Sequence, residues 1–136
     1  MNIRNVGIIG QGFVGSALKS AFSPHYEVYT YDKISTDLST HKNVHDLSRA
    51  CELIFVCVPT PMREDGSCDI SIVKEVVQQA CSTGRRNIIA IKSTIPPNTT
   101  KALQHLCQDS QIVFNPEFLL ERRAEDDMRK TSRIIL

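Results

Sequence analysis

Apolar and polar positions follow two alternating periods along the chain, and each period predicts one kind of element. Short apolar runs of β type occupy residues 5–9, 27–31, 53–58, 87–91 and 111–114, and a sixth run closes the sequence at residues 133–136. Between these runs, apolar residues recur at the three- and four-residue spacing of helices. Strands that alternate with helices predict a doubly wound parallel sheet of about six strands, with right-handed crossovers and helices on both faces.

The helical stretches carry start signals of their own. Asn43 is a predicted N-cap for a short helix that runs to Ala50. Asp69 is a predicted cap for the next helix, whose apolar stripe comprises Ile72, Val73, Val76, Val77 and Ala80. Asn98 opens a further helix, and the charged stretch that ends at Lys130 holds at most a short one.

The first strand runs directly into a glycine-rich turn that opens a helix. Gly10 allows the turn, Gly12 lets a pyrophosphate approach the backbone, and Gly15 lets the helix lie close on the strand. Asp32 closes the second strand, about 20 residues on, where a carboxylate accepts the ribose hydroxyls and repels a 2′-phosphate. This pattern indicates a Rossmann-type fold that binds NAD in preference to NADP, although the neighbouring Lys33 softens that preference.

Composition excludes several other classes of function. The chain has 136 residues, of which 41% are hydrophobic, and a formal net charge of +1. That length suits one domain, residues 1–136, and that charge gives no reason to expect a nucleic acid or a membrane as partner.

The five cysteines show no spacing typical of a metal site or of a disulfide framework. We therefore expect no metal, no disulfide and a reducing cytoplasmic location. Cys57 lies inside an apolar run and Cys81 and Cys107 lie on helices, so all three are interpreted as packing residues.

Polar or proline-rich groups follow the predicted strands and share one edge of the sheet. Besides the glycine loop and Asp32, these are residues 59–61 (Pro-Thr-Pro), 92–94 (Lys-Ser-Thr) and 115–117 (Asn-Pro-Glu). Ligands of open parallel sheets bind beyond the carboxyl ends of the strands. The sequence therefore predicts one shared site at this edge.

These segments, in this order and along the whole chain, resemble the NAD-binding domain of the UDP-glucose/GDP-mannose dehydrogenase family. The segments that carry the resemblance are Gly-Ile-Ile-Gly-Gln-Gly-Phe-Val-Gly, Phe-Val-Cys-Val-Pro-Thr-Pro, Lys-Ser-Thr-Ile-Pro-Pro and Asn-Pro-Glu-Phe-Leu. The resemblance implies oxidation of the C6 hydroxyl of a nucleotide sugar to a carboxylate, as in the conversion of UDP-glucose to UDP-glucuronate. Two NAD are reduced, and the intermediate is a thioester on a cysteine.

The resemblance also implies roles for single residues. Cofactor binding falls to Gly10, Gly12, Phe13, Val14, Gly15, Asp32, Lys33, Val58, Pro59, Thr60, Thr94 and Glu121. Thr94 and Glu117 are the implied catalytic residues, with Glu117 ordering or deprotonating the hydrolytic water. Substrate contacts fall to Glu117, Phe118, Leu119 and Glu121. Family members often have a small residue where this chain has Arg122, so the local loop departs from the family pattern.

The family's nucleophilic cysteine has no counterpart here, so the chain is expected to be the N-terminal cofactor part of a longer enzyme that forms a homodimer. Such a part binds NAD but does not complete the oxidation. Two alternatives remain open. One is a stand-alone NAD-binding sensor or interaction module, and the other is the cofactor domain of a different β-hydroxyacid-type dehydrogenase.

Overall fold

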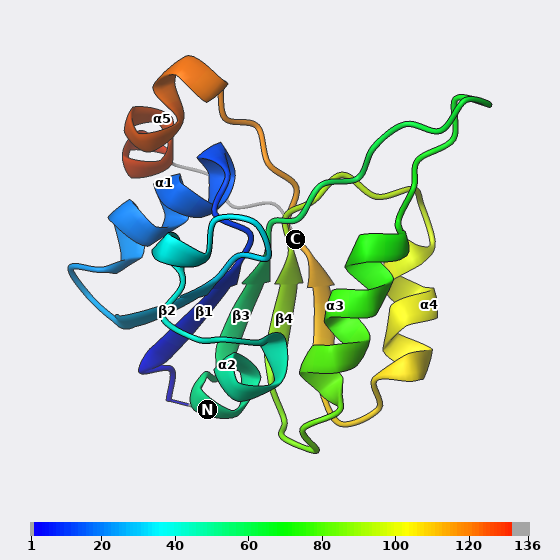
Figure 1. The fold of residues 1–136 in the computed structure, drawn as a ribbon, viewed down its shortest axis with the longest axis horizontal. Coiled ribbons are helices and arrows are strands. Elements are labelled where there is room, and N and C mark those ends of the chain that lie inside the picture. The colour runs from blue at the N-terminus through cyan, green and yellow to red at the C-terminus, as the bar shows by residue number, and fades with distance from the viewer. Residues whose placement is uncertain (1, 132–136) are drawn as a thin grey trace.

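A computed structural model describes residues 2–131 of the chain as a single parallel sheet covered by helices (Figure 1). Its five strands lie in the order β2-β1-β3-β4-β5, and every neighbouring pair is parallel. The strands are β1 (Asn5–Ile9), β2 (Glu27–Tyr31), β3 (Leu53–Val56), β4 (Ile88–Ile91) and β5 (Gln111–Phe114). The predicted doubly wound sheet is confirmed, and the predicted sixth strand, residues 133–136, lies outside the described residues.

Strand β3 ends two residues earlier than predicted. The Val58 carbonyl accepts the Ser93 hydroxyl at 2.7 Å, so a side chain takes the place of a ladder N–H there. The chain then turns away at Pro59, which has no N–H to donate.

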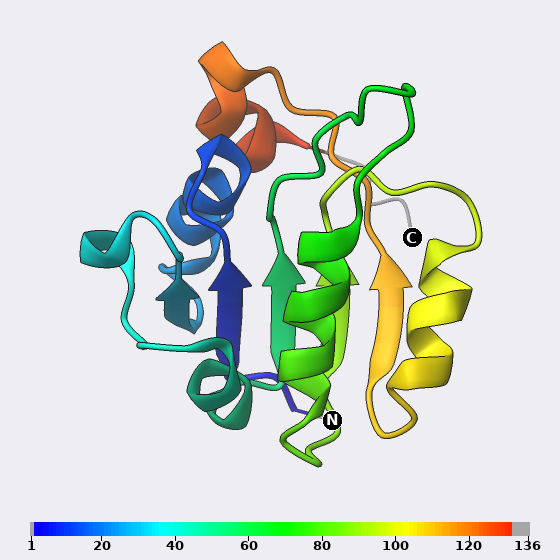
Figure 2. The ribbon, with the colours of Figure 1, turned by 45° about the vertical axis from the view of Figure 1, so that its right-hand side comes forward.

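The helices divide between the two faces of the sheet (Figure 2). Helix α1 (Phe13–Phe22) covers one face, and α5 (Ala124–Lys130) packs against it. The other face carries α2 (Val44–Ala50), α3 (Ser71–Cys81) and α4 (Thr99–Leu106). Two short 3₁₀ turns, Thr36–Leu38 and Glu121–Arg123, complete the described elements. Among residues 2–131, no helix has both the length and the apolar character that crossing a bilayer requires.

Side chains alternate along each strand between two separate cores. In β1, Ile9 joins the core beneath α2, α3 and α4, whereas Ile8 joins the core beneath α1. In β3, Val56 and Phe55 divide in the same way. Both faces of a parallel sheet must be buried, which explains why these strands are continuous apolar runs in the sequence.

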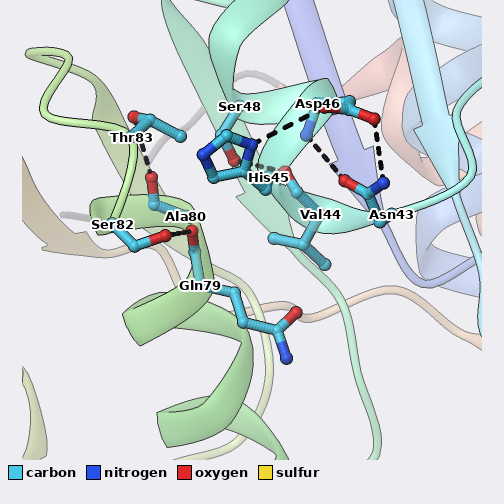
Figure 3. Close-up of polar contacts among 9 residues, drawn as sticks. All are labelled: Asn43, Val44, His45, Asp46, Ser48, Gln79, Ala80, Ser82 and Thr83. Atoms are coloured by element: carbon cyan, nitrogen blue, oxygen red, sulfur yellow. Dashed lines mark hydrogen bonds and ion pairs between the residues drawn. The ribbon is translucent and has the colours of Figure 1, made fainter.

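The start of α2 agrees with its predicted cap (Figure 3). The Asn43 Oδ1 accepts the Asp46 N–H at 2.8 Å, and the Asn43 Nδ2 donates to the Asp46 carboxylate at 2.8 Å. Such reciprocal bonds satisfy a donor that a helix end leaves without a partner.

Helix α3 begins at Ser71, and the carboxylate of Asp69 accepts the Ser71 N–H at 2.9 Å from a position just before the cap residue. The predicted apolar stripe of α3 is buried at Val73, Val76, Val77 and Ala80. Ile72 was wrongly placed in that stripe, because 37% of its surface is exposed.

Cys81 and Cys107 form a disulfide between the ends of α3 and α4, with their Cα atoms 5.6 Å apart. The expectation of no disulfide was therefore wrong. The two cysteines are 26 positions apart in sequence, and only the packing of α3 beside α4 brings them together. Cys51, Cys57 and Cys68 are free thiols, and Cys57 packs against the core beneath α1 as expected.

Candidate functional site

The glycine loop joins β1 to α1 in a conformation that only glycine permits at two positions. Gly10 has a φ of +94°, and a Cβ there would collide with the backbone carbonyl of Cys57. A Cβ on Gly15 would overlap the carbonyl oxygen of Gly10, so the first turn of α1 lies directly on the loop. Around Gly12, by contrast, a Cβ would meet nothing within 4 Å, and the backbone faces open space.

Asp32, just beyond β2, is held by the backbone of the glycine loop. Its Oδ2 accepts the Gln11 N–H at 2.7 Å, and its Oδ1 accepts the N–H groups of Ile34 and Ser35 at 2.8 Å each. Burial alone raises the pKa of this carboxyl, but the three backbone hydrogen bonds outweigh it, so the pKa of Asp32 lies below its ordinary value. The carboxylate is therefore ionised and fixed in orientation.

The loop and Asp32 form one end of a cavity of about 420 Å³. Predicted residues that line it are Gly10, Gly12, Asp32, Lys33, Val58 and Pro59. The opposite wall belongs to α3, through residues Ile72, Glu75, Val76 and Gln79.

Cys57 also lines this cavity, and burial raises the pKa of its thiol to about 12. The charge of Lys92 acts to lower this pKa, and the carboxylate of Glu117 acts to raise it. A thiol with that pKa is no nucleophile near neutral pH.

A second cavity, of about 670 Å³, opens on the face of the sheet that carries α1. Its polar end is formed by residues that follow β4 and β5: Lys92, Asn115, Glu117 and their neighbours. The Lys92 ammonium lies 2.7 Å from Glu117 Oε2 and donates to Asn115 Oδ1 at 3.0 Å. The other Glu117 oxygen accepts the N–H groups of Phe118 and Leu119 at 2.8 and 3.0 Å.

The remaining predicted residues lie around the same carboxyl edge but outside the first cavity. Phe118 and Leu119 line the second cavity, while Thr60 is half-buried and Thr94 is exposed. Val14 packs into the core beneath α1. Glu121 and Phe13 lie together in a surface depression beside the start of α1, so the chain after β5 returns to the glycine loop.

Several contacts at these cavities could not be predicted from the sequence. The N–H of Gln11 is a backbone group, and its role leaves no mark on residue type. Lys92 pairs with Glu117 across two strands, which only the register of β4 and β5 determines. The stripe of α3 that lines the first cavity could have been predicted from the sequence, because its residues recur at helical spacing. They are Ile72, Glu75, Val76 and Gln79. No group of three or more potential metal ligands occurs among residues 2–131.

Comparison with known sequences and structures agrees with this geometry. Residues 25–136 match the family described as "UDP-glucose/GDP-mannose dehydrogenase family, NAD binding domain". The fold is similar to that of a UDP-glucose dehydrogenase from Pyrobaculum islandicum, with a TM-score of 0.87 and 23% identity over 98% of this chain and 40% of that one.

Two relatives with related names align at higher identity. A UDP-glucose 6-dehydrogenase of Pseudomonas aeruginosa is 34% identical over 96 residues, which cover 62% of this chain and 21% of that protein. A putative UDP-glucose 6-dehydrogenase of Bacillus subtilis is 33% identical over 129 residues, which cover 88% of this chain and 30% of that protein. The chain thus spans less than a third of the length of either relative.

Proposed function

Because the chain belongs to the UDP-glucose/GDP-mannose dehydrogenase family, as its NAD-binding domain, we propose that the cavity between the glycine loop and α3 holds the adenosine half of NAD. The pyrophosphate lies on the glycine loop at the start of α1. There the helix dipole and the N–H groups of the first turn attract anions. Asp32 accepts a hydroxyl of the adenosine ribose.

The observation that carries this proposal is the contact between Asp32 and the Gln11 N–H. One carboxylate oxygen binds the loop itself, so the ribose acceptor and the phosphate loop are held at a fixed separation. A carboxylate offers about four acceptor positions, and three are used, which leaves one for a ribose hydroxyl.

The glycine loop also fits the group it would bind. The space beside Gly12 is free of protein atoms within 4 Å of a Cβ position, as close approach of a phosphate requires. Lys33 is exposed beside Asp32 and softens the rejection of a 2′-phosphate without removing it. Phe13, Val14 and Gly15 support the loop from α1.

Calorimetric titration with NAD and NADP tests the proposal. We expect the chain to bind NAD more tightly than NADP and Asp32→Ala to lose that preference. Asp37→Ala, an exposed carboxylate just beyond the same strand, is the control and should keep it. Equal affinity of the unchanged chain for both dinucleotides would contradict the role of Asp32.

We further propose that the chain is one domain, the cofactor part of a nucleotide-sugar 6-dehydrogenase that works in the cytoplasm and forms a homodimer. Its relatives' names and greater length support the assignment to a longer nucleotide-sugar dehydrogenase. When bound, NAD supplies the acceptor for hydride. Thr60, Thr94 and Glu121 lie toward the nicotinamide, and Phe118 and Leu119 toward the sugar nucleotide. Glu117 orders the hydrolytic water, as the family resemblance implies.

Mixing this chain with UDP-glucose and NAD, and following NADH absorbance, separates this proposal from others. We expect NAD binding without turnover, since the reaction needs a thiolate nucleophile and the family resemblance gives the nucleophilic cysteine no counterpart in these 136 residues. Robust turnover by the 136 residues alone would contradict it. A natural chain that stops at Leu136 would instead favour a stand-alone NAD-binding module.

A further inference from the structure

Helix α3 presents two different stripes of side chains. Val73, Val76, Val77 and Ala80 belong to the core. Ile72, Glu75, Val76 and Gln79 line the cavity that Asp32 also lines, so Val76 belongs to both stripes. These four positions follow the i, i+3, i+4, i+7 spacing of a single helix face. The second stripe therefore forms a continuous wall of the proposed adenosine site.

The polar members of that wall are coupled. The Gln79 Nε2 donates to Glu75 Oε1 at 3.1 Å, one helical turn apart, and this bond orients the carboxylate. Within residues 2–131, no donor contacts the second oxygen of Glu75. Val44 of α2 lines the same cavity as Gln79.

Two apolar side chains that line the cavity are exposed. Ile34, two residues beyond Asp32, is 90% exposed, and Ile72 at the start of α3 is 37% exposed. Both line the cavity. Exposed isoleucines that flank a cavity suit a flat apolar ring placed between them. With its ribose at Asp32, the ring of adenosine reaches this position.

We infer that Glu75, held by Gln79, selects adenine by accepting a hydrogen bond from its 6-amino group. The inference rests on the proposed placement of adenosine in this cavity. The 6-amino group is a donor and the carboxylate oxygens of Glu75 are acceptors, so the two are complementary. Gln79 keeps one amide hydrogen for a ring nitrogen of the base.

Replacing the amino group by oxygen, as in hypoxanthine, turns the donor into an acceptor. The free oxygen of Glu75 then faces the oxygen of the base, and the hydrogen bond is replaced by repulsion. Glu75 and Gln79 are exposed, so we take the low end of the range for a hydrogen bond to a charged group, which corresponds to about a tenfold change in affinity. The chain should therefore bind nicotinamide hypoxanthine dinucleotide about ten times more weakly than NAD.

Calorimetric titration of the chain with the two dinucleotides tests this selectivity. We expect the ratio of their dissociation constants to be about ten for the unchanged chain and close to one for Glu75→Gln, because the new amide can donate to the oxygen of hypoxanthine. Gln79→Met, which removes the orienting donor, should give an intermediate ratio. Gln78→Met, on the same helix but outside the cavity, should leave the ratio unchanged.

The variant Asp32→Ala distinguishes the role of Glu75 from the proposed binding of NAD. That variant should weaken the binding of both dinucleotides equally and keep the ratio, since the ribose is the only part of the dinucleotide that Asp32 contacts. Equal affinities for the unchanged chain, or an unchanged ratio in a folded Glu75→Gln variant, would overturn the role of Glu75 while leaving NAD binding intact. Failure of the unchanged chain to bind NAD would overturn the proposed function, and this inference with it.

Discussion

Lys92 and Glu117 form a buried ion pair between the ends of β4 and β5, with Nζ and Oε2 2.7 Å apart and the two side chains only 7% and 14% exposed. A buried charge is tolerated only with a partner, so each of these residues depends on the other. Asn115 and two backbone N–H groups complete the arrangement. The pair fixes the segment on which the proposed catalytic carboxylate lies.

Removing one partner of this pair should be more damaging than removing both. We expect Lys92→Met to lower the free energy of unfolding by about 3–5 kcal/mol, because the Glu117 carboxylate stays buried without its partner. The double variant Lys92→Met/Glu117→Gln should recover part of that loss. Urea denaturation measures both. Arg63→Met, which breaks the exposed pair with Asp69, serves as control and should cost less than about 1 kcal/mol. Equal effects at the two pairs would contradict the importance of burial.

Two glycines of the loop should respond differently to the same added methyl group. Gly15→Ala places a Cβ on the Gly10 carbonyl, backbone against backbone, and should reduce stability by about 2 kcal/mol. Gly12→Ala meets nothing within 4 Å and should leave stability within about 0.5 kcal/mol. This variant should nevertheless reduce the affinity for NAD more than tenfold, because the methyl group occupies the proposed phosphate position. Thermal unfolding together with NAD titration separates the two effects. Normal NAD binding by Gly12→Ala would show that the phosphate does not bind beside Gly12.

The pKa of Asp32 predicts how stability depends on pH. Burial acts to raise this pKa, but the hydrogen bonds from Gln11, Ser35 and Ile34 lower it below its ordinary value of 3.8. A carboxyl whose pKa is lower when folded stabilises the protein above its unfolded pKa, and the contribution disappears as pH falls through the folded pKa. The stability difference between the chain and Asp32→Asn should be constant above about pH 5 and narrow below about pH 4. Denaturation midpoints at pH 6, 4, 3 and 2 check this, and a difference that stays constant throughout would refute the lowered pKa.

The disulfide between Cys81 and Cys107 should be measurable in the purified chain. Titration of thiols in denaturant should find three reactive groups before reduction, from Cys51, Cys57 and Cys68, and five after it. Closing a loop between positions 26 apart contributes about 3 kcal/mol, so a reductant or Cys81→Ser should reduce stability by about that amount. Cys68→Ser is the control, because its thiol is free and partly exposed. In a reducing compartment we expect the dithiol form to predominate. Five reactive thiols without reductant would contradict the bond.

The glycine loop and Asp32 could be predicted because their roles are local. Gly10 and Gly15 are required by the turn in which they lie, and Asp32 follows a strand that pairs directly with the one before the loop. The two-period pattern likewise fixed the order of strands and helices, since both faces of a parallel sheet demand burial.

The amino-acid sequence by itself thus determined a parallel α/β domain with a dinucleotide loop, because periodicity and turn residues act over a few positions. Tertiary structure alone decided that Cys81 meets Cys107, that Lys92 pairs with Glu117, and that Glu75 faces Asp32 across a cavity. Each of these contacts depends on how far one helix or strand extends beside another. A shift of one residue in any element would turn those side chains away, and residue type does not reveal that distance.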